Sequence, residues 1–329
     1  MQRNGNLTGT RHRVLVTGSR GKSSIVRMLH AAMSEAGLQA WARITGVVPR
    51  ELGPGGVRTI ARSSAAHVEE MRWWLRRLPR SAQAVILENS AISPDLQGLA
   101  GLWLKPDITV FSNAVPDHQE AWGPSWESAA KVLVDGIPRA GKVILPADLQ
   151  HDSYLVDLLD KRQCKPVFAA MDAGIEKGYK AVNLGLALAV IENLGLGVNC
   201  ARESMLALPK DRFDFRVLRR GGADIAMAFS ANDVHSTRML FDSLHWSEQE
   251  TRLVYNHRSD RPARFASFSD WLRHSQWKEV LVIGDRPRSR PASSRYLKVR
   301  RPQELLDLFR PGERVFGCGN IAGLPLALF

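Results

Sequence analysis

The sequence predicts an α/β fold: a P-loop domain with a mostly parallel sheet flanked by helices, followed by a smaller Rossmann-like domain. Short apolar runs alternate with amphipathic segments along the chain, which is the pattern of parallel sheets covered by helices. A glycine-rich turn, GSRGKSS at 18–24, follows the first apolar run and opens a helical pattern. The length of 329 residues suits two domains of ordinary size.

The first domain is expected over residues 1–212. Apolar residues recur at helical spacing over 23–37, and Gly37 is suited to end that helix. Further helices are expected at 180–195 and 201–209. The expected strands are 13–18, 39–46, 84–90, 107–113, 142–146 and 165–170.

A second alternation predicts the second domain over residues 213–329. The segment KDRFDFRV (210–217) is expected to join the two domains, and this half has the size of a small Rossmann-like domain. The expected strands are 223–230, 251–256, 278–284 and 314–319, and the expected helices are 233–245 and 264–274.

The chain is basic, with a formal net charge of +12. This charge favours an anionic partner, namely nucleic acid, an anionic lipid surface or an acidic substrate, although solubility explains it equally well. Basic residues cluster at 71–80 and 286–301, but neither segment has a nucleic-acid fold signature, so no nucleic-acid partner is expected. Three widely spaced cysteines suit a reducing compartment, and no signal peptide or membrane-spanning run is visible, which predicts a cytoplasmic protein.

The turn at 18–24 predicts a phosphate-binding loop, since N–H groups that open a helix hold anions. Gly18 and Gly21 let the backbone approach the phosphates closely. Lys22 is expected to place its charge between phosphates, and the Ser23 hydroxyl to ligate magnesium. Two residues separate Gly18 from Gly21, whereas the common nucleotide loop has four at this place. The remaining loop residues are Ser19, Arg20 and Ser24.

Polar residues follow two other buried strands. Glu88 ends an apolar strand and is either paired structurally or ligates magnesium, and the P-loop favours magnesium. Asn113, Asp117 and His118 lie just past the strand at 107–113. Because ligands of parallel sheets bind at the carboxyl ends of strands, we expect these groups to share one site.

Together, GSRGKSS, the strand-end Glu88 and SNAVPDHQE resemble the ATP-dependent amide ligases of the Mur ligase superfamily, which have a short P-loop of this form. Within it, the chain resembles in particular the poly-γ-glutamate synthase ligase subunits of capsule biosynthesis. The resemblance runs from residue 14 to 325 through VLVTGSRGKSS, ARITGVVPR, ILENSAISPDLQ, FSNAVPDHQEAWG, AFSANDVHST, NHRSDRP and GCGNIAGLP.

The resemblance implies an ADP-forming amide ligase that activates a carboxylate as an acyl phosphate and joins it to an amino acid amine, glutamate in particular. It implies ATP and two Mg²⁺ ions as cofactors. Lys131 is either the carbamylated lysine that some members use or an exposed helix lysine. The implied catalytic residues are Lys22, Glu88, His118 and Arg212; the implied metal ligands are Ser23, Glu88 and His118; the further nucleotide contacts are Asn113, Asn183 and Arg212.

The resemblance also implies substrates and partners. The amine donor is an amino acid, and the acceptor is an acidic chain. Small integral membrane subunits, a homo-oligomer and a place at the inner face of the cell membrane are further expectations. The implied substrate residues are Arg43, Thr45, Gly46, Asn232, Asp233, Ser236, Asn256, Arg258 and Arg261.

Two other functions remain open at this point. One is a different P-loop enzyme, such as a small-molecule kinase or an ATPase, which has no need for the FSANDVHST and NHRSDRP segments. The other is a basic membrane- or nucleic-acid-binding module without ligase activity. ATP hydrolysis that depends on an added amino acid distinguishes the ligase from both.

Overall fold

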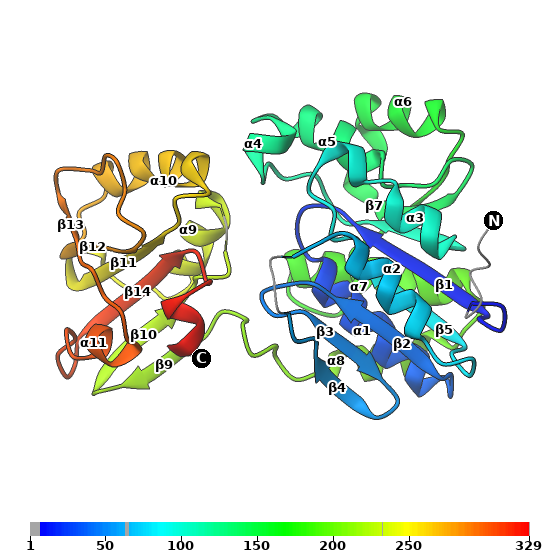
Figure 1. Ribbon diagram of the computed structural model, residues 1–329, viewed down its shortest axis with the longest axis horizontal. Helices are drawn as coiled ribbons and strands as arrows, with labels where there is room; N and C mark the ends of the chain where they lie inside the picture. Colours follow the sequence, from blue (N-terminus) through cyan, green and yellow to red (C-terminus); the bar gives the residue numbers. More distant parts are fainter. Residues whose placement is uncertain (1–6, 63–65, 232, 329) are drawn as a thin grey trace. The chain divides into compact units, whose positions relative to one another are not determined.

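The chain forms two compact units, Met1–Pro209 and Lys210–Phe329, each with its own sheet (Figure 1). The computed structural model describes residues 7–62, 66–231 and 233–328. The functional boundary expected between residues 212 and 213 stays a prediction.

Unit 1 contains an eight-stranded sheet in the order β4-β3-β2-β5-β1-β6-β7-β8. The six neighbouring strands β2, β5, β1, β6, β7 and β8 are parallel to one another. Strand β3 pairs antiparallel with β2, and β4 pairs antiparallel with β3. The strands are β1 (His12–Thr17), β2 (Ala40–Ile44), β3 (Arg50–Gly53), β4 (Gly56–Thr59), β5 (Ala84–Glu88), β6 (Ile108–Phe111), β7 (Lys142–Pro146) and β8 (Lys165–Ala169).

Helices cover both faces of this sheet because alternate strand residues point to opposite sides. Val14 and Val16 of β1 share a core with α1, α7 and α8, whereas Leu15 packs with α2 and α3. The helices are α1 (Lys22–Glu35), α2 (Glu69–Arg77), α3 (Leu99–Leu104), α4 (Gln119–Trp122), α5 (Trp126–Val134), α6 (Ser153–Lys161), α7 (Tyr179–Asn193) and α8 (Val198–Leu206), with 3₁₀ turns η1 (Pro94–Leu96) and η2 (Ala147–His151).

Unit 2 contains a six-stranded sheet in the order β13-β12-β11-β14-β10-β9. All neighbours are parallel except β9, which pairs antiparallel with β10. Its elements are β9 (Val217–Arg220), β10 (Ala223–Met227), α9 (Val234–Asp242), η3 (Glu248–Glu250), β11 (Thr251–His257), α10 (Pro262–His274), β12 (Glu279–Gly284), β13 (Ser294–Tyr296), α11 (Pro302–Leu306), β14 (Arg314–Gly319) and η4 (Leu324–Leu328).

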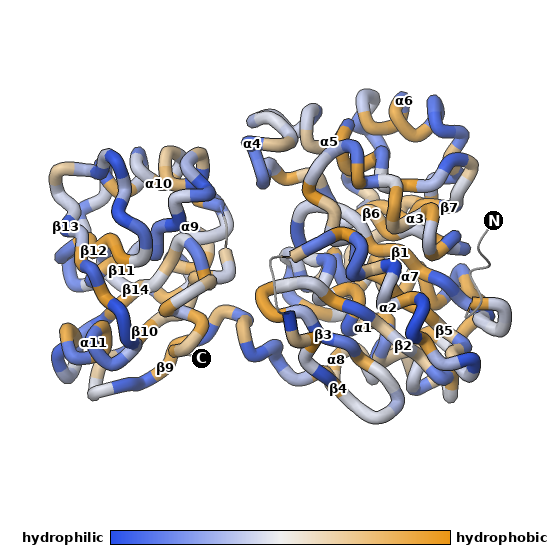
Figure 2. The backbone as a smooth tube through the Cα atoms, viewed as in Figure 1, coloured by the Kyte–Doolittle hydropathy of each residue, from blue (hydrophilic) through white to orange (hydrophobic). Residues whose placement is uncertain are grey.

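The predicted α/β class is confirmed in both units. Strands β5 (AVILE) and β12 (EVLVIG) are apolar over most of their length (Figure 2), as expected for strands covered on both faces. The β3–β4 hairpin and helices α2, α3, α4 and α6 of unit 1 were not predicted from the sequence, nor were β9 and α11 of unit 2. Within the described residues, no helix is long and apolar enough to cross a bilayer.

Candidate active site

Four adjacent strands of unit 1 end at the same edge of the sheet and carry the predicted groups there. β2, β5, β1 and β6 are neighbours, and the registers Val16↔Glu88 and Thr17↔Phe111 bring the ends of β5, β1 and β6 level. The segments that follow these strands include the P-loop and Asn113. The common edge predicted from the sequence is therefore present.

The P-loop connects β1 directly to α1 and depends on its two glycines. Gly18 and Gly21 have φ angles of 124° and 79°, which side chains rarely tolerate. A Cβ on Gly18 would lie 2.2 Å from Ser112 Oγ, and one on Gly21 would lie 2.7 Å from Asn183 Oδ1. Asn183, on α7, is thus packed directly under the loop.

Lys22 folds back over the loop that precedes it. Its ammonium donates to the carbonyl of Gly18 at 2.5 Å and to that of Ser19 at 3.2 Å. Burial lowers the pKa of Lys22, while the negative charges of Glu88 and Asp117 oppose that shift. Lys22 is therefore a desolvated cation, and its attraction for an anion exceeds that of an exposed lysine.

The segment after β6 braces the P-loop from the side. Asn113 Oδ1 accepts from Ser19 Oγ at 2.6 Å and from the Arg20 N–H at 3.2 Å. Ser112 Oγ donates to the Arg20 carbonyl at 2.6 Å. Ser112 was not among the predicted site residues, although it lies beside Asn113 in the FSNAV segment.

Glu88 connects the P-loop to the loop after β2. Its carboxylate accepts from Ser23 Oγ at 2.8 Å, from Thr45 Oγ1 at 2.6 Å and from the Thr45 N–H at 3.2 Å. Its exposed fraction is 3%, so the charge is almost fully withdrawn from water. Gly46 also lies close to Ser23, because a Cβ on Gly46 would be 3.2 Å from Ser23 Oγ.

The donors around Glu88 fit a hard divalent cation. A carboxylate and two hydroxyls are oxygen ligands of the kind that Mg²⁺ prefers. In residues 7–62, 66–231 and 233–328, no three His, Cys, Asp or Glu side chains gather as a metal cluster, so a zinc-type ligand set is not present in this part of the chain.

Arg20, Asp117 and His118 form a second polar group beside the loop. Asp117 Oδ2 lies 3.6 Å from Arg20 Nη2 and 3.8 Å from His118 Nε2. His118 has a φ of 49°, and its ring lies 5.0 Å from the Trp122 ring. The structure thus joins Asp117 and His118 to the P-loop through Arg20.

Arg43, which is expected to contact substrate, lies in the core of unit 1, and its substrate role stays a prediction. Its exposed fraction is 1%, and its Nη2 donates to Glu70 Oε2 at 2.7 Å. Its Nε and Nη1 have no hydrogen-bond partner within the described residues. Glu70 also binds Arg62 through both carboxylate oxygens. The Glu70–Arg62 pair was not foreseen, since no motif pointed to it.

Two further unit 1 candidates lie on helices. Ser24 is half-buried in the first turn of α1, next to the metal candidate Ser23. Lys131 is exposed in the last turn of α5. Its carbamylation stays a prediction.

In unit 2, some predicted substrate residues hold the fold together. Asp233 caps α9 by accepting from the Ser236 N–H at 2.7 Å. Asn256, at the end of β11, donates to the carbonyls of Asn320 and Ala322 at 2.6 and 2.9 Å. Asn320, in the quoted GCGNIAGLP segment, had been given no role. Asn232 lies outside the described residues.

The three arginines of unit 2 that were predicted to be site residues are exposed or half-buried. Arg258 binds Asp260 through two hydrogen bonds of 2.9 and 2.6 Å, and Arg261 Nε lies 4.0 Å from the same carboxylate. Arg212 is exposed and lies over the ring of Phe213 at 5.9 Å. The roles of these arginines stay predictions.

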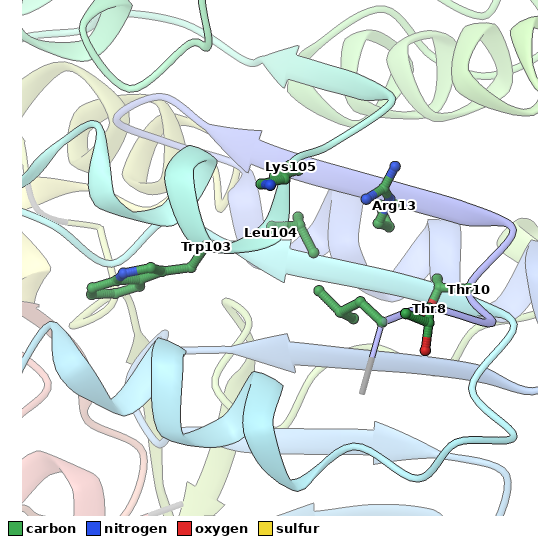
Figure 3. Close-up of a pocket in the computed structure, with 7 residues that line it drawn as sticks. Thr8, Thr10, Arg13, Trp103, Leu104 and Lys105 are labelled. Carbon is green, nitrogen blue, oxygen red and sulfur yellow. The ribbon is translucent and has the colours of Figure 1, made fainter. Parts of the chain in front are cut away.

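A separate pocket of about 340 Å³ lies toward the start of β1, whereas the P-loop follows its end (Figure 3). Arg13 within it is engaged by Asp107 at 3.0 Å. None of the predicted site residues lines this pocket. Its lining residues are Leu7, Thr8, Thr10, Arg13, Trp103, Leu104 and Lys105.

Comparison with known proteins places these features in a family. The Mur ligase middle domain matches residues 16–188, and the C-terminal domain of poly-gamma-glutamate synthase CapB matches residues 215–329. PGA synthase CapB of Bacillus subtilis (strain 168) is 25% identical over 94% of this chain and 87% of its own length.

Solved structures show the same fold. A bifunctional folylpolyglutamate synthase/dihydrofolate synthase from Yersinia pestis, complexed with AMPPNP and Mn ion, has a TM-score of 0.65 at 16% identity and covers 98% of this chain and 89% of its own. A structure of such an enzyme with Mn, AMPPNP and L-glutamate bound has a TM-score of 0.67 at 16% identity, covering 98% and 90%. The predicted fold is thereby confirmed. Because the middle-domain match spans more than half of the sequence, the chain belongs to the Mur ligase family.

Proposed function

We propose that this chain is an ATP-dependent amide ligase that adds glutamate to an acidic acceptor in the synthesis of poly-γ-glutamate. The observation that carries the proposal is the position of Glu88, which joins Ser23 of the P-loop to Thr45. The match to CapB over both units and the nucleotide, metal and glutamate in structures of the same fold support it.

The reaction follows from the chemistry of a carboxylate. Its oxygen is a poor leaving group, so the acceptor carboxylate first attacks the γ-phosphorus of ATP, giving an acyl phosphate and ADP. The amine of glutamate then attacks the acyl carbon, loses a proton and displaces inorganic phosphate. Such phosphoryl chemistry depends mainly on positioning and on neutralisation of charge.

The groups of unit 1 suit the first step. The N–H groups of the P-loop and the start of α1 attract phosphate oxygens, and Lys22 adds a desolvated positive charge. Ser112, Asn113 and Asn183 hold the loop in its binding conformation. Asn113 and Asn183 remain candidates for direct contact with the nucleotide.

Residues for two divalent ions are proposed at the same edge. Ser23 and Glu88 would hold the first, and His118 with Asp117 the second, which Lys131 would join if carbamylated. Bound magnesium supplies positive charge against the phosphate oxygens. Arg20 keeps Asp117 and His118 beside the P-loop through its 3.6 Å ion pair.

Unit 2 is proposed to bind the amino acid. Arg258 and Arg261 offer positive charge for its carboxylates, and Asn256 and Asp233 keep the ends of β11 and α9 in place. Arg212 is proposed to contact the nucleotide. Thr45 and Gly46 are proposed to face the acceptor, with Arg43 supporting their loop from within the core. Membrane partner subunits and a homo-oligomer belong to this proposal as well.

The test is ADP release from ATP and magnesium with and without glutamate and an oligoglutamate acceptor, followed by mass spectrometry of the products. Glutamate-dependent ADP release with an amide product is expected. Lys22→Ala should abolish it, and Lys161→Ala, which removes an exposed lysine of α6, should not. A phosphorylated small molecule without an amide product would overturn the ligase proposal in favour of a kinase.

A further inference from the structure

The segment 286–301 of unit 2 carries an unusual charge for its length. It contains seven basic residues and no acidic residue, and all seven are exposed. They are Arg286, Arg288, Arg290, Arg295, Lys298, Arg300 and Arg301. The segment starts after β12, contains the edge strand β13 and ends where α11 begins.

The backbone of this segment is well anchored. Asp285, just before it, accepts from the N–H and hydroxyl of Ser259, both at 2.8 Å. Ser294 N–H donates to the Pro291 carbonyl at 2.9 Å and closes a turn that leads into β13. Tyr296 Oη donates to the Gly284 carbonyl at 3.1 Å. The backbone of the segment is therefore tied to unit 2 before it begins, at the turn into β13 and at Tyr296.

Most of these charges are not used within the unit. Arg295 pairs with Glu279 and Arg301 with Glu304, each at 2.8 Å. In the part of the chain that the structure describes, the side chains of four others have no acidic partner within 4 Å: Arg286, Arg288, Lys298 and Arg300. Charged side chains can protect an edge strand from pairing with another strand, but that role needs fewer charges than this segment carries.

The chemistry of the surface limits the kind of anion it suits. Single-stranded nucleic acid is bound by basic grooves with exposed aromatic rings, and the aromatic residue of this segment, Tyr296, is half-buried. Membrane binding that inserts into the bilayer uses exposed large apolar side chains beside basic residues, and none of the large exposed apolar residues belongs to 286–301. Helix α2 differs, because Trp73 there is 51% exposed.

We propose that the segment 286–301 binds the polyanionic chain of the acceptor, a polymer of carboxylates, through carboxylates other than the one that reacts. The proposal rests on the proposed function for the identity of the polymer. Carboxylates spaced along a flexible chain need neither stacking rings nor apolar insertion. Several weak charge contacts then act together on one molecule, so longer chains are held more tightly than short ones.

The experiment measures binding of fluorescently labelled poly-γ-glutamate to the full chain by anisotropy, without ATP. Two double variants, Arg286→Gln/Arg288→Gln and Lys298→Gln/Arg300→Gln, remove charges from the segment, and their combination removes four. Arg219→Gln/Arg220→Gln on β9 is the matched control, since it removes two exposed arginines from the opposite edge of the same sheet. A thymidine oligonucleotide and phosphatidylglycerol vesicles serve as competing probes.

We expect the fourfold variant to weaken polymer binding about tenfold or more at low salt, and the control to remain within about twofold. Binding should weaken as salt rises and strengthen with polymer length. Equal losses in the β9 control, or tighter binding of the oligonucleotide or vesicles than of the polymer, would overturn the proposal. Because this assay needs no catalysis, a failure of the ligase proposal would leave its outcome readable.

A second readout separates the surface from the reaction. The fourfold variant should add glutamate to a diglutamate acceptor at the normal rate, and it should give shorter products from a long acceptor. Unchanged product length, together with unchanged binding, would show that the segment has no part in holding the chain.

Discussion

Substitution of Glu88 by glutamine should separate the structural role of this residue from its chemical role. Glu88 Oε2 accepts from Ser23 Oγ at 2.8 Å and from the Thr45 N–H, whereas Oε1 accepts from Thr45 Oγ1 at 2.6 Å. A glutamine fits this arrangement if its oxygen takes the first position. Its amide group then donates to Thr45 Oγ1, because a hydroxyl also accepts.

The expected stability cost follows from these contacts. Three charge-assisted bonds become neutral ones, which weakens them, but a buried charge also disappears, so we expect Glu88→Gln to cost about 1 kcal/mol. Glu88→Ala leaves the N–H and hydroxyl of Thr45 and the hydroxyl of Ser23 without their acceptor, for a cost of about 3 kcal/mol. Activity should fall about 100-fold or more in both, because the negative charge that would hold the metal is lost.

The assay combines urea unfolding of the full chain with the rate of glutamate-dependent ADP release. The expected result is near-normal unfolding with a large loss of rate for Glu88→Gln, and losses of both for Glu88→Ala. A glutamine variant that kept at least half of the normal rate would refute the assignment of Glu88 to the metal. One that unfolded as easily as the alanine variant would refute the hydrogen-bond exchange.

Three further outcomes are expected. Gly21→Ala should weaken ADP binding at least tenfold, because the new Cβ would meet Asn183. The control is Gly37→Ala, which has a similar φ of 76° and open space around it, so it should cost only backbone strain of about 1 kcal/mol. Equal effects of the two substitutions would contradict this reasoning. Burial lowers the pKa of Lys22, and the charge of Glu88 opposes this shift, so metal-free ADP binding should weaken as pH rises through that pKa. In Glu88→Gln the opposing charge is gone, so the loss of ADP binding should begin at lower pH. A loss that begins at higher pH in this variant would show the reasoning wrong. Glu313→Ala should destabilise unit 2 by about 3 kcal/mol in urea unfolding, since it removes the buried partner of Arg252 and Lys278, whereas Glu304→Ala on the surface should have little effect.

The part of the fold that the sequence predicted is the part with strong apolar runs. Buried parallel strands such as 142–146 and 314–319 read as continuous apolar segments, and they are found at those bounds. The β3–β4 hairpin was missed because its strands have four residues each and every residue of β4 is exposed. Its Gly-Pro-Gly-Gly segment also looks like an irregular loop.

The site was predictable where a residue follows a strand directly. Glu88 and the P-loop meet because parallel strands end at one edge, and that rule requires only the order of the strands. The pairing of Arg43 with Glu70 was not predictable, because Glu70 comes from a helix that packs on the sheet and no periodicity places its carboxylate. Likewise, nothing in the sequence points to the two hydrogen bonds that Asn256 donates to the carbonyls of Asn320 and Ala322, because an amide at a strand end suits a substrate contact or an internal bond.

The short P-loop is explained by what surrounds it. A loop with two residues between its glycines has few N–H groups of its own with which to fix its shape, so its conformation depends on contacts from outside. Ser112 and Asn113 bind the backbone of Arg20 from the β6 side, and Asn183 packs against Gly21 from α7. The side chain of Arg20 in turn holds Asp117. One short loop thereby couples the nucleotide edge to the group that includes His118, because Arg20 contacts Asn113 and Ser112 through its backbone and Asp117 through its side chain.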